Sequence, residues 1–273
     1  MQIARFVDPE GVLRAGVDRG DGTAELLPTD DPLGATLRPT GEVATIAQRQ
    51  PPVRPANIYC IGLNYRKHAK ETGQPLPEHP VMFMKPTASA IGHQQPIRLP
   101  RCQLRGPEVD YEGELAVIIG KAGRDIPEER AGQHILGYTI GHDVSARRWQ
   151  KEAGGGQWIR GKGFDTFCPL GPVMVTSDEL TNPQQMALTT IVNDQVMQQS
   201  NTSDMIFTIE KLIAFLSQDT TLLPGTVVLT GTPEGVGVAR DPAVFLHAGD
   251  QVKITIDSIG TLTNPVADAA DAD

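Results

Sequence analysis

The amino-acid sequence predicts a mixed, β-rich α+β fold with few helices. Its 273 residues include Gly 28 and Pro 22, and these high counts favour short strands joined by turns over a bundle of helices. Apolar stretches of strand length recur along the chain, whereas clear helical periodicity is rare. Hydrophobic residues make up 39% of the chain, which is enough for a packed core.

Residues 1–50 are expected to form a small N-terminal β-rich unit. Its strand-like segments, separated by Gly and Asp turns, are residues 2–8, 12–18 and 23–28. A short helical stretch is expected between the last of these and the proline-rich residues 48–57. The prolines indicate a linker to the main domain, expected over residues 57–266. The acidic residues 267–273, which are rich in small side chains, are expected to form a flexible tail.

The main domain is predicted to open with a strand running into a turn over residues 57–65, followed by a short helix over 65–73. Asn64 is placed to cap this helix, and Gly73 is placed to end it in the left-handed conformation. Further strand-like segments are residues 81–85, 96–100, 114–120, 135–143, 171–176, 187–194, 226–231 and 252–257.

The clearest amphipathic helix is predicted over residues 208–218. Thr208 is placed as its N-cap, and apolar residues recur at helical spacing at Ile209, Leu212, Ile213 and Leu216. This pattern predicts a helix that packs on a sheet and carries no chemistry.

The composition argues against several classes of function. With a net charge of −9 and no block rich in Lys and Arg, the chain is not expected to bind nucleic acid. The sequence contains no run of about 20 apolar residues, the length needed to span a membrane. The first residues also lack the apolar segment of a signal peptide. Cys60, Cys102 and Cys168 lack CxxC spacing, which favours free thiols in a cytoplasmic protein over disulfides or a zinc site. No GxGxxG follows a strand, so a nicotinamide oxidoreductase is disfavoured.

Two carboxylates lie two residues apart, just before a buried apolar run. Glu112 and Glu114 would project from the same face of a strand and repel each other unless a cation lies between them. The alternative is that both side chains face solvent on an edge strand, and the pair by itself favours that interpretation.

A third carboxylate favours a metal site. Asp143 ends the strand-like stretch at residues 135–143, and with Glu112 and Glu114 it would form an oxygen-only ligand set. Such a set suits Mg²⁺ or Mn²⁺, with Ca²⁺ as a further candidate, and leaves coordination positions for water and substrate. His142 is expected to point to the opposite face of its strand and is left out of the set.

Seven sequence blocks, in order, resemble the fumarylacetoacetate hydrolase superfamily over nearly all of residues 57–266. The blocks are "IYCIGLNYRKHAKETG", "DYEGELAVIIGK", "GHDVSARRWQ", "GKGFDTFCPLGP", "SDMIF", "LPGTVVLTGTPEGVG" and "GDQVKITIDSIGTLTNPV". The third and fourth look closest to the short single-domain members, which include acylpyruvases, oxaloacetate tautomerase-decarboxylases and 2-hydroxyhepta-2,4-diene-1,7-dioate isomerase-like proteins. The resemblance implies a rolled β-sheet with few helices and a homodimer. It also implies Mg²⁺ or Mn²⁺ held by Glu112, Glu114 and Asp143.

Lys162 matches the active-site lysine of this superfamily. Beside a metal and three carboxylates, a lysine would hold an oxyanion or orient a water molecule. Without the resemblance, a surface lysine next to a glycine turn is the better interpretation. The surrounding "GKG" is not a phosphate loop, because the required upstream Gly and the following Ser or Thr are absent.

His68 and Glu71 lie three residues apart and so share one face of the predicted helix. A carboxylate bonded to imidazole raises its basicity and fixes its tautomer, which makes a candidate general base for water. A solvated helical face is the alternative. The resemblance favours catalysis, because the matching His and Glu lie on a segment that closes over the substrate.

Three further residues match positions that contact substrate in the superfamily. Arg147 suits a carboxylate because its fork donates two hydrogen bonds, and Gln150 lies three residues further on. Thr232 lies on a turn whose hydroxyl and backbone N–H groups would hold a substrate carboxylate, unless the turn serves backbone shape alone. Arg148 is a departure from relatives, which often have an acidic residue there.

The predicted reaction proceeds through a metal-stabilised enolate of a small 2-oxo or 1,3-diketo acid. Delivery of water by His68 and Glu71 would give C–C bond hydrolysis of the acylpyruvate or fumarylacetoacetate type, which we place first. The same residues would support oxaloacetate keto–enol tautomerisation, decarboxylation or isomerisation, since all of these reactions share the enolate. A catalytically silent, metal-binding family member is a further alternative.

Overall fold

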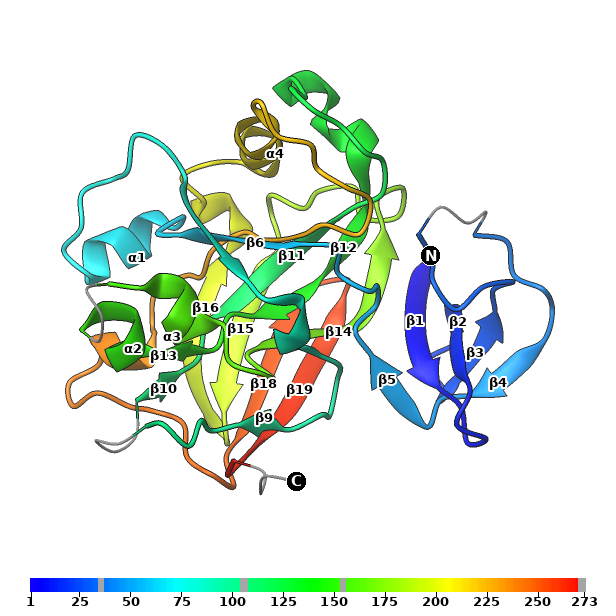
Figure 1. The fold of residues 1–273 in the computed structure, drawn as a ribbon, viewed down its shortest axis with the longest axis horizontal. Coiled ribbons are helices and arrows are strands. Elements are labelled where there is room, and N and C mark those ends of the chain that lie inside the picture. The colour runs from blue at the N-terminus through cyan, green and yellow to red at the C-terminus, as the bar shows by residue number, and fades with distance from the viewer. Residues whose placement is uncertain (34–36, 104–107, 153–155, 270–273) are drawn as a thin grey trace.

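The computed structural model describes residues 1–33, 37–103, 108–152 and 156–269. Within these residues the chain is organised around two β-sheets (Figure 1). The larger sheet follows the order β4-β3-β2-β1-β14-β12-β11-β17-β6-β7, and the smaller one follows β16-β15-β18-β19-β9. The predicted mixed, β-rich fold with few helices is confirmed.

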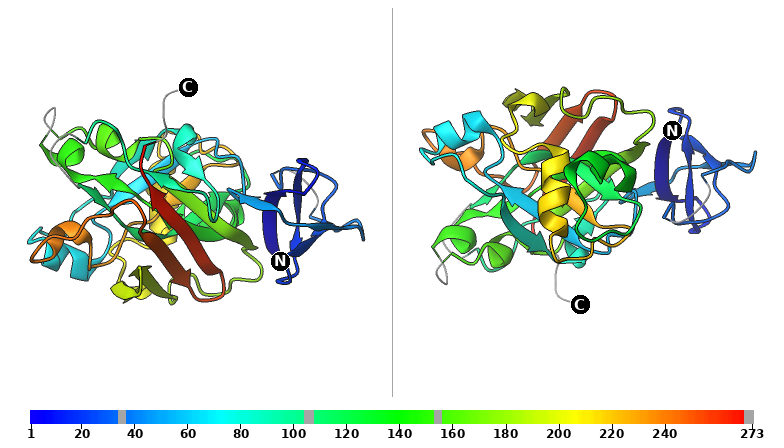
Figure 2. Two further views of the ribbon diagram at one scale, coloured as in Figure 1. Left: turned by 90° about the horizontal axis from the view of Figure 1, so that it is seen from below. Right: turned by 90° about the horizontal axis from the view of Figure 1, so that it is seen from above.

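The N-terminal strands extend the larger sheet. They are β1 (Gln2–Val7), β2 (Leu13–Asp18), β3 (Thr23–Leu26), β4 (Val43–Thr45) and β5 (Gln48–Gln50). β1 pairs antiparallel with β14 (Cys168–Thr176), and this unit projects from one side of the molecule in all three ribbon views (Figures 1 and 2).

The short helix expected before residues 48–57 is wrong for the described residues. The chain there returns as β4, and backbone hydrogen bonds from Thr40 and to Glu42 join it to Leu26 of β3. Pairing with a neighbouring strand therefore satisfies the backbone groups that a helix would have paired locally. Residues 34–36, which fall within the same stretch, lie outside the described residues.

The central strands of the larger sheet carry the site. They are β6 (Ile58–Gly62), β7 (Val81–Lys85), β11 (Gly113–Ile119), β12 (Ile135–His142), β14 and β17 (Val227–Leu229). All seven residues of β11 are buried, because it lies between β12 and β17 and is covered on both faces. Its neighbours hold β11 in place, so residues at its N-terminal end have a defined position.

The smaller sheet packs against one face of β11 and β12. Its strands are β15 (Ala187–Val192), β16 (Gln195–Asn201), β18 (Gln251–Ile256), β19 (Gly260–Ala267) and β9 (Ile97–Arg98). One core cluster takes side chains from both sheets, including Leu115, Ile140, Leu188, Ile254 and Leu262. Short strands complete the fold, namely β8 (Ala90–Ile91), β10 (Val109–Asp110) and β13 (Ser145–Ala146). Residues 270–273 of the predicted tail lie outside the described residues.

The helices are short. They are α1 (Arg66–Glu71), α2 (Arg147–Lys151), α3 (Trp158–Lys162) and α4 (Ile209–Ser217), with 3-10 turns at Thr87–Ser89, Glu128–His134, Thr202–Asp204 and Gly237–Ala239. Helix α4 confirms the amphipathic prediction, and the Thr208 hydroxyl accepts a hydrogen bond from Lys211 N. Among the described residues, no helix combines the length and the apolar character needed to cross a membrane.

Helix α1 also corrects one predicted cap. Gly73 follows it with φ +66°, as predicted. Asn64 does not cap it, because its side chain bonds Phe207 N and the carbonyls of Phe207 and Thr230 instead. The amide of Asn64 thus ties the start of the helix to two distant segments.

Candidate metal and substrate site

Three carboxylates meet where β11 begins and β12 ends. The antiparallel register pairs Gly113 with His142, which brings Asp143 beside Glu112, and Asp143 N donates to the Glu112 carbonyl at 2.9 Å. Glu112, Glu114 and Asp143 are all buried. One carboxylate oxygen from each lies within 4.8 Å of those from the other two.

The residue between the two glutamates has to be small. A Cβ at Gly113 would lie 3.1 Å from the Ile254 side chain and 3.4 Å from Gln198 Oε1, so a side chain there would push the smaller sheet away. Glycine therefore allows the two sheets to approach closely at the point where the carboxylates emerge.

Lys162 lies among these carboxylates. Its Nζ donates to Glu112 Oε2 at 2.7 Å, Asp143 Oδ2 at 2.6 Å and Ser145 Oγ at 2.8 Å. Burial disfavours the charged lysine, but Asp143 and Glu112 outweigh that effect and raise its pKa. Lys162 is therefore a buried, charged ammonium group, and the surface-lysine interpretation is wrong.

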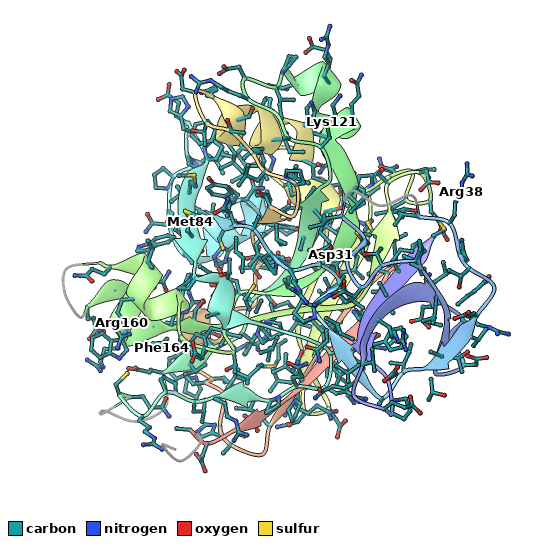
Figure 3. All side chains as sticks on the ribbon, turned by 45° about the vertical axis from the view of Figure 1, so that its right-hand side comes forward. Asp31, Arg38, Met84, Lys121, Arg160 and Phe164 are labelled. Carbon is teal, nitrogen blue, oxygen red and sulfur yellow. The ribbon has the colours of Figure 1, made fainter. Side chains whose placement is uncertain are left out.

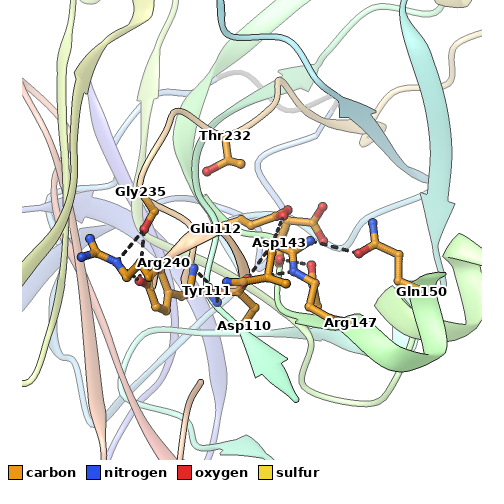
Figure 4. A network of polar contacts seen from close by, with 12 residues as sticks. Asp110, Tyr111, Glu112, Asp143, Arg147, Gln150, Thr232, Gly235 and Arg240 are labelled. Carbon is orange, nitrogen blue, oxygen red and sulfur yellow. Dashed lines mark hydrogen bonds and ion pairs between the residues drawn. The ribbon is translucent and has the colours of Figure 1, made fainter. Parts of the chain in front are cut away.

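Arg147 bridges two carboxylates in the network of Figure 4. Its Nη2 lies 2.6 Å from Glu112 Oε1 and 2.8 Å from Asp110 Oδ2, and its Nη1 donates to Gln150 Oε1 at 3.0 Å. Burial disfavours the charged form of Arg147, but Glu112 and Asp110 raise its pKa. The guanidinium is thus a fixed part of the site and not a mobile surface group.

His68 and Glu71 form the pair that their spacing predicts. His68 Nδ1 lies 3.0 Å from Glu71 Oε2, and Glu71 Oε1 accepts a hydrogen bond from Gly235 N at 2.8 Å. Burial opposes ionisation of Glu71, but the bonds from His68 and Gly235 lower its pKa. Since Nδ1 is engaged, Nε2 is the ring atom that His68 can offer to a substrate.

Thr232 uses its hydroxyl proton within the protein. Its Oγ1 donates to the Gly113 carbonyl at 3.1 Å and accepts from Gln198 Nε2 at 2.8 Å. A substrate carboxylate at this turn would therefore have to be bound by other donors than the hydroxyl.

These side chains share one cavity of about 380 Å³. It is lined by every predicted catalytic, substrate-binding and metal-binding residue except Glu71, which reaches it through His68. The apolar part of its wall is Ile61, Leu63, Val81, Trp158, Val236 and Val238. The cavity has room for a small organic acid, with the carboxylates and cations in its polar wall.

A family model described as fumarylacetoacetate (FAA) hydrolase C-terminal matches residues 57–267. The chain belongs to the fumarylacetoacetate hydrolase family. It is an enzyme of this family, and its rolled, β-rich fold is the family's fold.

Known members of the fumarylacetoacetate hydrolase family resemble this chain closely. It is 49% identical to "Oxaloacetate tautomerase fahd2, mitochondrial" of Xenopus laevis, over 82% of this chain and 69% of that protein. The crystal structure of 5-carboxymethyl-2-hydroxymuconate delta-isomerase from Mycobacterium smegmatis has a TM-score of 0.85 and 42% identity, covering 98% and 100% of the two chains. Fumarylpyruvate hydrolase from Pseudomonas aeruginosa, in complex with Mn²⁺ and pyruvate, has a TM-score of 0.70 and 32% identity, covering 81% and 92%.

The charge balance of the site fits a divalent cation. Burial opposes ionisation of Glu112, but Arg147 and Lys162 outweigh it and lower its pKa. For Glu114, burial comes first and the neighbouring charges of Asp143 and Glu112 add to it, so its pKa is raised well above the usual value. Glu114 therefore has too little positive charge beside it to be ionised easily. A divalent cation would supply that charge, and three carboxylates are the hard oxygen ligands that Mg²⁺ or Mn²⁺ takes. Glu112, Glu114 and Asp143 would hold it.

Arg148, the departure from the family pattern, points out of the cavity. Its Nε donates to Glu108 Oε2 at 3.0 Å, and its guanidinium carbon lies 4.9 Å from the centre of the Trp149 ring. It forms a second carboxylate–arginine pair next to the Asp110–Arg147 pair, and this one lies outside the cavity.

Two functional residues escaped the sequence analysis. Lys85 Nζ lies 2.7 Å from Asp143 Oδ1 and donates to the carbonyls of Val144 and Phe167. Asp110 accepts hydrogen bonds from Gly237 N and Val238 N as well as from Arg147. The sequence did offer a signal for each of them. Lys85 ends the apolar stretch at residues 81–85, and Asp110 lies two residues before Glu112.

Proposed function

We propose that this enzyme is a Mg²⁺- or Mn²⁺-dependent oxaloacetate keto–enol tautomerase. The carrying observation is that the carboxylate triad and His68, whose Nε2 is left free by Glu71, line the same small cavity. The name of the 49% identical relative supports this choice. Tautomerisation therefore takes the place of C–C bond hydrolysis, the reaction expected first from the sequence.

The residues of the chain have separate tasks in this proposal. A divalent cation, when bound, supplies positive charge against which the enolised 2-oxo acid is stabilised. Lys162 adds a fixed positive charge beside the triad. His68 takes a proton from C3 of the oxo acid at Nε2 and returns it to the C2 oxygen, while Glu71 holds the imidazole in one tautomer. The net change is the movement of one proton.

The direct test follows the decay of enol-oxaloacetate absorbance with Mg²⁺, Mn²⁺ or EDTA present. We expect enzyme-dependent decay in both metal arms and none above the uncatalysed rate with EDTA. The same protein is assayed for loss of acylpyruvate absorbance and for release of CO₂ from oxaloacetate. Folded protein that accelerates none of these reactions with either metal would favour the silent, metal-binding alternative.

C–C bond hydrolysis remains the second candidate. The His68–Glu71 pair favours it, because such a pair also suits the activation of water, and the similar Mn²⁺ and pyruvate complex is of a fumarylpyruvate hydrolase. Metal-dependent cleavage of acylpyruvates faster than the tautomerisation of oxaloacetate would put hydrolysis first. The homodimer and the cytoplasmic location stay predictions.

Replacing His68 by Ala separates the two candidates. If His68 moves the proton, tautomerisation should fall by about 10²- to 10⁴-fold, the usual contribution of a general base. The matched control is His247→Ala, since His247 also has an acidic residue, Asp250, three positions on, but is exposed and outside the cavity. If His68→Ala spares tautomerisation and removes only acylpyruvate cleavage, the histidine delivers water, and the proposed proton transfer is wrong.

A further inference from the structure

Lys151 is the last residue of α2, and its side chain lines the cavity with Arg147 and Lys162. Those other two cations are committed, Arg147 to Asp110 and Glu112 and Lys162 to Glu112 and Asp143. No carboxylate in the described part of the chain lies within 4.0 Å of the Lys151 ammonium group. Lys151 is therefore a cavity cation with no direct ion-pair partner among the described residues.

The surroundings of Lys151 favour an anion. Burial lowers the pKa of Lys151 and the positive charge of Arg147 lowers it further, whereas the charges of Asp110 and Glu112 oppose this shift without reversing it. A negative group that entered the cavity beside Lys151 would relieve this repulsion. Asp110, Glu112 and Asp143 each form an ion pair with another cation, so none of them is a direct partner of Lys151.

A short dicarboxylic acid matches this arrangement. We place its 2-oxo acid end at the triad, which would hold the cation. The cavity of about 380 Å³ is small and is lined by both the triad and Lys151, so the second carboxylate stays close to the polar wall. A monocarboxylic 2-oxo acid would leave Lys151 without a partner. A carboxylate with an ammonium group is a charge-assisted pair, which is stronger than a neutral hydrogen bond.

We propose that Lys151 binds the second carboxylate of a short 2-oxo dicarboxylate and so selects dicarboxylates over monocarboxylates. The inference rests on the proposed function, because it adds a recognition residue to the same site. It assigns specificity to Lys151 and leaves the proton transfer to His68.

The kinetic test compares oxaloacetate with its 4-methyl ester, in which a methyl group replaces the distal charge. In Lys151→Met, KM for oxaloacetate should rise by about 5- to 10-fold, a moderate effect because Lys151 is exposed to solvent. The value of kcat should change by less than about 2-fold, the ester should be unaffected, and Lys151→Arg should retain most of the preference. Equal effects of Lys151→Met on the acid and the ester would overturn the proposal.

The matched control is Lys121→Met, which removes the same charge elsewhere. Lys121 follows the far end of β11 and lies away from α3 and its Arg160 in Figure 3. Lys121 is two residues beyond the end of β11, and the strand itself, Gly113–Ile119, spans roughly 20 Å. Lys121→Met should leave KM unchanged for both oxaloacetate and its ester. If it raised KM for oxaloacetate as much as Lys151→Met does, the effect would come from the net charge of the protein, and the proposed role of Lys151 would be wrong.

A binding experiment separates this inference from the proposed function. Calorimetry with Mg²⁺ compares malate with lactate, two unreactive 2-hydroxy acids that differ by the distal carboxylate. Tighter binding of malate by the wild type, lost in Lys151→Met, supports the role of Lys151 even if oxaloacetate is not tautomerised. Equal affinities for malate and lactate in the wild type would overturn it, even if tautomerisation is observed.

Discussion

Replacing Glu114 by Gln is expected to abolish metal-dependent turnover and, at the same time, to stabilise the metal-free protein. The amide oxygen can still accept the hydrogen bond that Gly231 N now gives to Glu114 Oε2 at 2.7 Å. The Gln side chain cannot ionise, so the negative charge that burial, Asp143 and Glu112 disfavour at this position cannot form. Loss of a metal ligand should lower kcat/KM by at least about 100-fold, since even residues that only support a ligand cost 10- to 100-fold.

The stability gain should grow with pH. The folded-state pKa of Glu114 lies above its unfolded value, so wild-type stability falls as pH rises from the unfolded towards the folded pKa. The Gln variant lacks this loss. Scanning calorimetry with EDTA should show a Tm gap that widens as the pH rises above the ordinary glutamate pKa of about 4.3. It should reach at least about 2–4 °C, the shift expected for roughly 1 kcal/mol.

Glu112→Gln is the matched control, with the opposite sign. Glu112 pairs with Lys162 and Arg147, so its loss leaves two buried cations with fewer partners and should lower Tm. Both variants should lose bound metal, as measured by calorimetric titration with Mn²⁺. If Glu114→Gln bound Mn²⁺ as tightly as the wild type, Glu114 would not be a ligand, and a lower Tm would contradict the charge argument.

Replacing Asp110 by Asn is expected to destabilise the fold and to disable the site together. Asp110 is fully buried and accepts hydrogen bonds from Arg147, Gly237 N and Val238 N. Removing its charge leaves the buried Arg147 with a single carboxylate, Glu112. Breaking a buried ion pair costs about 3–5 kcal/mol, so Tm should fall by at least about 6 °C. Tautomerisation should fall by at least about 100-fold, because Arg147 and the cavity wall at Val238 both shift.

A double variant keeps this prediction testable if Asp110→Asn folds poorly. Asp110→Asn with Arg147→Met removes both charges and should recover much of the lost Tm without recovering activity. The matched control is Glu108→Gln, which breaks the parallel pair with Arg148 outside the cavity and should leave kcat/KM within about 2-fold. Equal losses of activity in Asp110→Asn and Glu108→Gln would show that Asp110 has no special role in the site.

The elements that the sequence predicted well are those with a strong local pattern. Helix α4 has an apolar face and a capping threonine, and β11 is a continuous apolar run, so each was predicted to within about a residue. Helices α2 and α3 were missed because each has five residues, too few for a periodic pattern or for stability by propensity alone. Both exist because they pack against each other and against β13, and α3 also packs against β7.

The residues of the candidate site also fall into those that a local pattern predicted and those that it did not. The residue types of the triad pointed to a hard cation, and the spacing of His68 and Glu71 placed them on one helical face. Lys85 and Asp110 were missed because most of their partners are backbone groups distant in the sequence, such as Phe167 O and Gly237 N. No local pattern marks such a partner in advance.

By itself the sequence determined the relative directions of side chains that lie a few residues apart. Glu112 and Glu114 share a strand face with the needed glycine between them, because side chains alternate along a strand. Tertiary structure decided which distant groups meet. The register of β11 and β12 brings Asp143 to Glu112. The packing of α2 places Lys151 in the cavity wall, where no carboxylate of the described residues forms an ion pair with it. Local geometry follows from bond rotations that neighbouring residues share, whereas register and packing follow from burying the whole core at once.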